Sequence, residues 1–318
     1  MLDKLICIVM VLYIVFKILQ YTNDFCQIKM GNEIDGLEGM QGMEGVGLGG
    51  AIDKKYSYLK GLDVYDDFYA KVYDNLLHSS HKDKYIIKEL ANLAHLNSSS
   101  NVLDVGCGTG NMVNELYKQG IVNTIGLDIS KSMITKAKKK FHDRTFIVGD
   151  ALNRVLFPPN LFSHILCDYF TYYYFSNKHT FFKNCYYWLR PNGYLLLHTV
   201  DKHRFDPVVP PANPLYIVNA QKYAKERITK SKVTFYGFDY TSQFIVDRPK
   251  NNNISIFKET FKNKNNGNIR TQEHILFIEP IDDTLEIAQM EGFEILSRID
   301  LVHIQYEYQY IYILHKQQ

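Results

Sequence analysis

Apolar and polar residues follow two different spacings over the central part of the chain, and the two spacings alternate. Segments with apolar residues three or four positions apart are typical of helices with one apolar face, and they cover 64–77, 83–96, 111–120, 130–141 and 176–189. The short apolar runs between them are typical of strands buried on both faces, and they cover 101–106, 123–128, 144–150, 161–169 and 194–200. Strands that alternate with helices predict a parallel, doubly wound sheet with helices on both faces.

A later region changes to alternation of apolar and polar residues, which is the spacing of half-buried strands. The stretches 231–247, 254–261 and 269–279 show it, and the turn sequences "RPKNNN" and "KNKNNGN" separate them. We predict an antiparallel β-meander inserted into the α/β domain. The inserted region covers about residues 204–280 and is expected to form a lid over a substrate pocket.

The end of the chain returns to the first pattern. A helix is predicted over 283–292, and two strands are predicted over 293–302 and 308–316. The few residues between these strands suit an antiparallel hairpin at the edge of the sheet. The predicted fold is therefore an α/β, doubly wound, Rossmann-like sheet of seven strands whose last strand is antiparallel.

The N-terminal region differs in composition from the rest of the chain. Residues 5–16 read "LICIVMVLYIVF", and the apolar character continues past Lys17 to about Tyr21. This length suits a single membrane-spanning helix over residues 1–21, with contact to the membrane through about 4–21. A cleaved signal peptide and a buried core helix are the alternatives. An anchor of this kind predicts a membrane location with the rest of the chain facing the cytosol.

Residues 22–51 follow this hydrophobic helix and include the glycine- and methionine-rich stretch "GLEGMQGMEGVGLGG". No strand precedes these glycines, so they do not fit a dinucleotide-binding loop. We predict that residues 22–51 are a flexible linker. The folded domain then spans residues 52–318.

Charge and cysteine content exclude several functions. The formal net charge is only +2, which gives no electrostatic reason to expect a nucleic-acid partner. The five cysteines are scattered, with no pair spaced as in a zinc site or a disulfide framework. We therefore predict no metal. The sequence does not indicate an oligomeric state.

A glycine loop follows the first predicted strand, in "NVLDVGCGTGN" at 101–111. Its glycines let the backbone approach a ligand closely where a strand turns into a helix. The spacing is G-x-G-x-G rather than the G-x-G-x-x-G of dinucleotide sites. An acid, Asp104, precedes the loop; it would repel a pyrophosphate and would suit an amino-bearing ligand.

Two further acids end the next two predicted strands. Asp128 is placed to accept hydrogen bonds from ribose hydroxyls, and Asp150 is placed to accept one from an adenine amino group. Acids at three successive strand ends beside a glycine loop indicate an adenosine-containing ligand that also bears an amino group.

The motifs "VLDVGCGTG", "GLDISKSMITKAKKK", "FIVGDAL" and "WLRPNGYLLL" resemble those of class I S-adenosylmethionine-dependent methyltransferases. The resemblance covers roughly residues 64–200 and implies S-adenosylmethionine as the cofactor. It implies that Asp128 holds the ribose, that Ile129 and Met133 pack on the adenine, and that two tyrosines close over the cofactor. The cofactor-binding residues so implied are Tyr65, Tyr73, Asp104, Gly106, Cys107, Gly108, Gly110, Asp128, Ile129, Met133, Asp150, Ala151 and Cys167.

Catalytic residues are less clearly marked. A sulfonium methyl is already activated, so the protein mainly aligns the nucleophile, and a general base is needed only for a protonated acceptor. We place candidates after the fourth and fifth strands of the main sheet, at Asp168, Tyr172 and His203. The predicted function is methyl transfer to a nitrogen or oxygen of a small molecule. The alternatives are a membrane-held lipid or protein methyltransferase and a non-catalytic scaffold that binds the cofactor.

Overall fold

The computed structural model describes residues 55–209, 221, 224–246 and 253–317. These residues belong to one compact unit, Gly50–Gln318. The predicted anchor, 1–21, and the linker, 22–51, lie outside the described residues. Within the described ranges, no helix is both long enough and apolar enough to cross a membrane.

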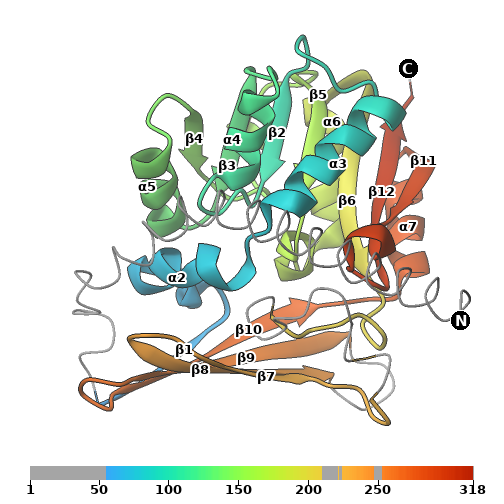
Figure 1. The fold of residues 1–318 in the computed structure, drawn as a ribbon. Coiled ribbons are helices and arrows are strands. Elements are labelled where there is room, and N and C mark those ends of the chain that lie inside the picture. Colours follow the sequence, from blue (N-terminus) through green and yellow to red (C-terminus); the bar gives the residue numbers. More distant parts are fainter. Residues whose placement is uncertain (1–54, 210–220, 222–223, 247–252, 318) are drawn as a thin grey trace, which may run out of the picture. The chain divides into compact units, whose positions relative to one another are not determined.

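The main sheet has seven strands in the order β11-β12-β6-β5-β2-β3-β4 (Figure 1). Neighbours from β4 to β6 are parallel, and β12 runs antiparallel to both β6 and β11. The predicted Rossmann-like α/β fold is thus confirmed. The strands are β2 (Val102–Val105), β3 (Thr124–Asp128), β4 (Thr145–Val148), β5 (Phe162–Cys167), β6 (Leu189–Val200), β11 (Phe293–Asp300) and β12 (Gln309–Lys316).

Helices cover both faces of this sheet. In Figure 1, α3 and α4 lie in front of it, and α6 and α7 lie behind. Short polar side chains start several of them: Ser79 caps α3 and Ser130 caps α5, each accepting a hydrogen bond from a backbone amide three residues later. The helices are α3 (Ser80–Leu93), α4 (Asn111–Lys118), α5 (Lys131–Lys140), α6 (Lys178–Trp188) and α7 (Ile281–Met290).

A second sheet has five strands in the order β1-β10-β9-β8-β7. It corrects the predicted three-stranded meander in two ways. The stretch 231–247 forms two strands, because residues between Phe235 and Phe238 make a tight turn closed by a hydrogen bond from Phe235 N to Phe238 O, 2.9 Å. An unpredicted strand also pairs parallel with β10 at the edge. The strands are β1 (Tyr56–Lys60), β7 (Lys230–Thr234), β8 (Phe238–Val246), β9 (Ile254–Asn263) and β10 (Ile269–Phe277).

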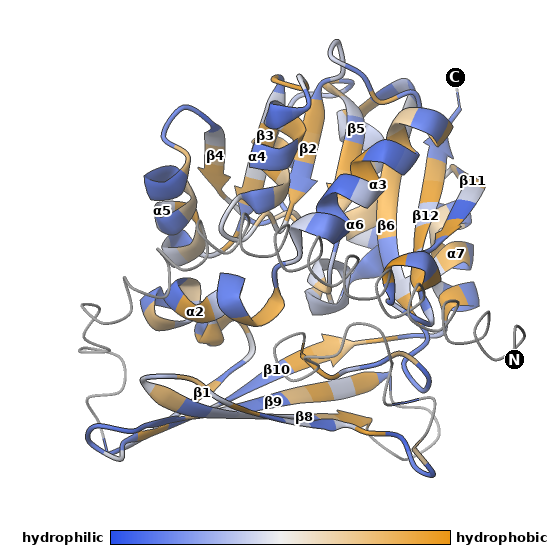
Figure 2. Cartoon of the chain, in the orientation of Figure 1, coloured by the Kyte–Doolittle hydropathy of each residue, from blue (hydrophilic) through white to orange (hydrophobic). Residues whose placement is uncertain are grey.

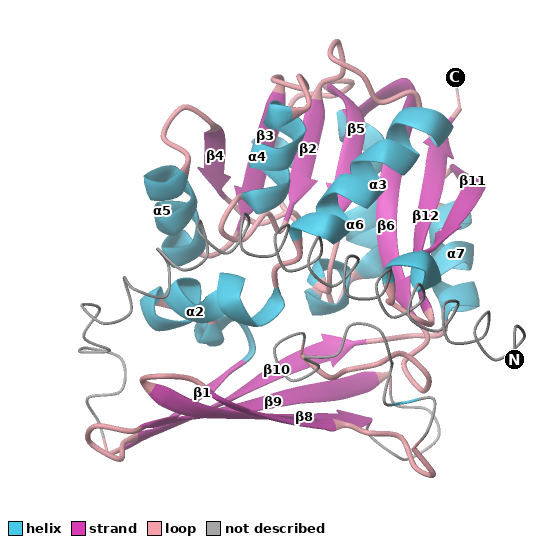
Figure 3. Cartoon of the chain, in the orientation of Figure 1, coloured by secondary structure: helices cyan, strands magenta, loops and turns pink. Residues whose placement is uncertain are grey.

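Helix α2 (Asp67–Leu77) lies between the two sheets (Figure 3). The predicted helix over 64–77 is shorter, because Gly61–Val64 forms a 3₁₀ turn, η1, that connects β1 to α2. Phe68 of α2 packs edge-on against Phe261 of β9, with ring centroids 5.1 Å apart. Figure 2 shows apolar residues on the central strands of the main sheet and on α2. Burial of each large apolar side chain contributes roughly 1.5–3 kcal/mol, so α2 joins the sheets firmly.

The Arg270 guanidinium fixes the start of α2 from the second sheet. Its Nη1 donates to Asp66 Oδ2 at 2.7 Å, and its Nη2 donates to Val64 O at 3.1 Å. Asp66 in turn caps α2 by accepting from the Tyr69 amide at 3.0 Å. The second sheet therefore sets the position of α2 and of the tyrosines that it carries.

Candidate functional site

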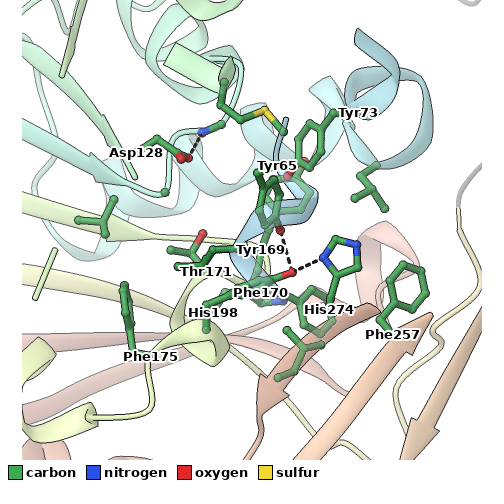
Figure 4. A pocket seen from close by; sticks show the side chains of 18 of the residues that line it. Tyr65, Tyr73, Asp128, Tyr169, Phe170, Thr171, Phe175, His198, Phe257 and His274 are labelled. Carbon is green, nitrogen blue, oxygen red and sulfur yellow. Dashed lines mark hydrogen bonds between the residues drawn. The ribbon is translucent and has the colours of Figure 1, made fainter. Parts of the chain in front are cut away.

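A cavity of about 390 Å³ opens at the carboxyl ends of the parallel strands, where α/β sheets bind their ligands (Figure 4). Residues from the main sheet, from α2 and from the second sheet line it. Gly106, Gly108 and Asp128 lie at one end, and Phe244 and His274 come from the second sheet.

The glycine loop has a backbone conformation that only glycine adopts without strain. Gly106, Gly108 and Gly110 have φ values of +72°, +52° and +84°. A Cβ at Gly106 would lie 2.2 Å from Thr171 Oγ1, so there is also no room for a side chain. Gly106 and Gly108 also line the cavity, so the loop backbone lies directly against it.

Asp128 holds this loop from the end of β3. Its Oδ2 accepts from the Gly108 amide at 2.9 Å (Figure 4), and its Oδ1 accepts from the Ser130 amide at 2.8 Å. Burial raises the pKa of Asp128, although these two amides oppose the shift. Each carboxylate oxygen keeps a lone pair for a further donor, such as a ribose hydroxyl.

A smaller cavity, about 30 Å³, lies beside Gly106 and is lined in part by Asp104, Cys107 and Asp168. Asp104 Oδ2 and Asp168 Oδ2 are buried there and have no hydrogen-bond partner among the described residues. Burial, and then the charge of Asp168, raises the pKa of Asp104 well above its usual range. Two unsatisfied carboxyl oxygens facing one small space fit a cationic or amino group of a ligand.

Residues 102–193 match a family model described as a methyltransferase domain. Phosphoethanolamine N-methyltransferase of Plasmodium falciparum is 33% identical to a stretch that covers 35% of this chain and 42% of that protein. The dTDP-3-amino-3,4,6-trideoxy-alpha-D-glucopyranose N,N-dimethyltransferase of Streptomyces venezuelae is 35% identical over 27% of this chain and 38% of that protein. The matched stretches thus span less than half of these two relatives.

Solved structures share the fold over more of the chain. The CcbJ methyltransferase of Streptomyces caelestis has a TM-score of 0.60 at 15% identity, covering 80% of this chain and 98% of that one. An S-adenosylmethionine-dependent methyltransferase of Clostridium acetobutylicum has a TM-score of 0.58 at 16% identity, covering 79% and 96%. Residues 102–193 thus carry a methyltransferase domain, within a fold that S-adenosylmethionine-dependent methyltransferases share. The S-adenosylmethionine site predicted from the motifs lies in this domain, at the carboxyl ends of its parallel strands.

The residues of the methyltransferase domain fit this cofactor. The two unsatisfied oxygens of Asp104 and Asp168 would accept from the ammonium group of its methionine part, and Asp128 would accept from its ribose. Most of the predicted cofactor residues line the large cavity. They are Tyr65, Tyr73, Gly106, Gly108, Asp128, Ile129, Met133, Asp150 and Ala151.

Three predicted cofactor residues have other surroundings. The Cys107 side chain packs in an apolar cluster with Val113 and Phe146, and the residue lines only the smaller cavity. Neither cavity includes Gly110 or Cys167 in its lining. Gly110 starts α4 next to Phe146, and Cys167 is fully buried in the main core.

Two of the three catalytic candidates, Tyr172 and His203, lie outside both cavities. The Tyr172 hydroxyl points into the core and donates to Glu279 Oε1 at 2.7 Å. His203 is exposed beyond the end of β6, and it lines neither cavity. Asp168 lines the smaller cavity, where its Oδ1 accepts from Lys82 Nζ at 2.9 Å. Burial acts to raise the pKa of Asp168, but Lys82, His198 and the Tyr169 amide outweigh it and lower the pKa.

The walls that face away from the cofactor residues are largely aromatic, and sequence reasoning did not assign them. The rings come from the loop after β5, from the segment after β6 and from the second sheet. They belong to Phe170, Tyr174, Phe175, Phe205, Phe244, Phe257 and His274. The sequence shows that aromatic residues make up 14% of the chain, but this content does not indicate where the rings point.

Charged groups are few on these walls. Lys82 is the one lysine or arginine among the described lining residues, and Asp168 already pairs with it. Burial lowers the pKa of His198 to about 4, so this lining histidine is neutral at pH 7. The described acids of the lining are Asp128, Asp150 and Asp206.

Proposed function

We propose that the chain transfers a methyl group from S-adenosylmethionine to the nitrogen of a small-molecule amine. The supporting observation is the continuous cavity, which joins the predicted cofactor residues around Asp128 to aromatic walls supplied by the second sheet. Two of the curated relatives carry names of N-methyltransferases that act on small molecules. They favour nitrogen over oxygen as the acceptor atom.

The residues of the cavity suit an in-line displacement. S-Adenosylmethionine, when bound, supplies a methyl group already activated by the positive charge on sulfur. The protein then has to orient the acceptor and exclude water, and effective alignment lowers the barrier by up to roughly 7–11 kcal/mol. Rings such as Phe170 and Phe244 provide dry, shaped walls for this purpose.

We propose further that the acceptor carries no phosphate. A phosphate group needs free lysine, arginine or helix-terminal donors, and the described lining offers only Lys82, whose ammonium is paired with Asp168. The aromatic rings, together with Asp206, favour a cationic or neutral amine with an apolar body. The specificity thus differs from the one that the name of the Plasmodium falciparum relative would suggest.

A transfer assay with three amines tests both proposals. The full chain is incubated with methyl-labelled S-adenosylmethionine and phenethylamine, an amino sugar or phosphoethanolamine, and labelled products are separated by mass. We expect label on the nitrogen of one of the first two amines and at least about tenfold less on phosphoethanolamine, because no free cation meets its phosphate. Asp128→Ala serves as the inactive control. Preferred methylation of phosphoethanolamine contradicts the phosphate-free acceptor, and methylation only of a hydroxyl contradicts the nitrogen acceptor.

We also propose that residues 1–21 hold the enzyme at a membrane, because twelve apolar residues at 5–16 precede a glycine-rich stretch. Deleting residues 1–21 is expected to move the protein from the membrane fraction to the soluble fraction, as measured by fractionation and immunoblotting. Deleting only residues 36–50 is the matched control and leaves the protein in the membrane fraction. Equal distribution of the full chain and the 1–21 deletion would exclude the anchor.

A further inference from the structure

Four side chains form a continuous hydrogen-bonded row from the cavity into the second sheet, and Figure 4 shows the part of the row between Tyr65 and His274. Tyr65 Oη donates to Tyr174 Oη at 2.7 Å, and Tyr174 Oη lies 2.7 Å from His274 Nδ1. His274 Nε2 lies 2.7 Å from Glu259 Oε2. Tyr65, Tyr174 and His274 line the cavity, whereas Glu259 is fully buried behind them.

The neighbours of Glu259 settle which atoms donate along this row. Arg270 Nε donates to Gln272 Oε1 at 2.8 Å, so the amide nitrogen of Gln272 faces Glu259, to which it donates at 2.7 Å. The Tyr240 hydroxyl also donates to Glu259, at 2.6 Å. Burial opposes ionisation of Glu259, but His274, Tyr240 and Gln272 outweigh it and lower its pKa. Glu259 is therefore a carboxylate that only accepts.

A carboxylate at Glu259 requires a hydrogen on His274 Nε2, and when the ring carries only that hydrogen, Nδ1 is an acceptor. The Tyr174 hydroxyl then donates to Nδ1, and its oxygen accepts from Tyr65. The oxygen of Tyr65 keeps a lone pair for a donor in the cavity. Every hydrogen in the row thus points from the cavity toward Glu259.

We propose that this row is a proton relay in which His274 is the base that deprotonates the acceptor amine. The inference rests on the proposed function, because it assumes an amine that reaches the site as an ammonium ion. A proton moves from the ammonium nitrogen to Tyr65 Oη, the Tyr65 proton moves to Tyr174, and the Tyr174 proton moves to His274 Nδ1. The freed lone pair forms the new N–C bond as the methyl C–S bond breaks, and the electron pair of that bond stays on sulfur.

Glu259 favours the transfer of the proton to His274. Buried histidines resist protonation, as His198 does. An imidazolium at His274 would instead lie beside a carboxylate, in a pair with an N–O distance of 2.7 Å. The other titratable groups around the ring are the phenols of Tyr65, Tyr69 and Tyr174. Burial raises the pKa of each phenol, so all three stay uncharged, and Tyr65 and Tyr174 pass protons on as neutral groups.

The test compares Tyr174→Phe, which interrupts the row, with Tyr173→Phe on the same 3₁₀ turn, η3 (Thr171–Tyr174). Tyr173 is a matched control because its hydroxyl accepts from the Val200 amide at 2.8 Å and does not line the cavity. Methyl transfer to the amine accepted by the wild type is measured from pH 7 to pH 9.5, and calorimetry measures S-adenosylmethionine affinity. A second variant, Glu259→Gln, removes the charge at the far end of the row.

We expect Tyr174→Phe to lower kcat about 100-fold at pH 7, the smaller end of the usual effect of a general base. The loss should shrink to within about fivefold at pH 9.5, because alkyl amines titrate near 10 and then arrive partly deprotonated. Glu259→Gln should follow the same course, Tyr173→Phe should stay within about threefold, and cofactor affinity should not change. A loss that is equal at all pH values, or no loss, overturns the relay. A wild-type chain that methylates no amine overturns the proposed function and the relay together.

Discussion

Replacing Asp128 with alanine is expected to weaken S-adenosylmethionine binding about 1,000-fold. The carboxylate would accept from the ribose hydroxyls, and each hydrogen bond to a charged group contributes about 1.5–3 kcal/mol, so two of them account for this loss. The same side chain ties the Gly108 amide to the end of β3, at 2.9 Å, so the glycine loop also loses support. Titration calorimetry on the purified chain measures the change.

Asp143→Ala is the matched control for this variant. Asp143 is exposed, and its carboxylate pairs with the neighbouring Arg144 rather than with the glycine loop. Its loss should leave the dissociation constant unchanged within about twofold. Asp128→Asn should give an intermediate affinity, because an amide oxygen still accepts. If Asp128→Ala binds the cofactor as tightly as the wild type, the assignment of the ribose site is incorrect.

Replacing Lys82 with methionine is expected to lower the free energy of unfolding by about 3–5 kcal/mol at pH 7. Lys82 and Asp168 are both almost fully buried, and removing one partner of such a pair leaves the other charge uncompensated. Urea denaturation followed by circular dichroism measures the loss. Lys84→Met, two positions along α3 at an exposed site, should change stability by less than about 0.5 kcal/mol.

The pH dependence gives this prediction a second readout. The pKa of Asp168 is lowered in the folded wild type, so the pair contributes stability above the unfolded pKa of about 4, and the contribution is lost as the pH falls through the folded pKa. Without Lys82, burial dominates and Asp168 binds a proton at higher pH. The stability gap between variant and wild type should therefore narrow from pH 7 to pH 4.5. A gap that is constant with pH would mean that the lost packing of Lys82, rather than the charge pair, causes the effect.

The main sheet and its helices can be predicted from the sequence because their signals are local. Ser130 caps α5 through the amide three residues later, and the positive φ values of the loop from Gly106 to Gly110 require glycine where they occur. All six residues of β5 are buried, and four of them are apolar. Asp128 can be assigned for the same reason, since it follows a strand at a fixed distance from the glycine loop.

The second sheet is harder to predict because several of its polar residues face the interior, where the alternation of polar and apolar residues would place apolar ones. On β10 the buried positions include Arg270, Gln272 and His274, whereas Ile269 and Ile275 are only half-buried. Polar residues that alternate with apolar ones usually face water. Here the inward polar residues find partners in the segment just before α2 and on β9, and the local sequence pattern does not predict those partners. The local sequence therefore does not predict that His274 lines the cavity.

The directions of the aromatic side chains near the cavity are also hard to predict from the sequence. Three consecutive tyrosines on η3 point to different places: Tyr172 to Glu279, Tyr173 to the Val200 amide and Tyr174 to His274. A short 3₁₀ turn spreads successive side chains around its axis. The sequence marks the cluster as aromatic, but only the tertiary structure decides which hydroxyl reaches the cavity.

The edge position of β1 in the second sheet has a consequence for the order of folding. Asp66, which follows β1 closely, is joined to Arg270 across 204 residues of sequence. During synthesis the segment from β1 to α2 is made before the main sheet, yet its partner strand β10 emerges only after the parallel strands β2 to β6. Contacts this distant in sequence form late and slow the folding of a domain. The newly made chain therefore assembles the glycine loop first and closes the acceptor side of the cavity among its final steps.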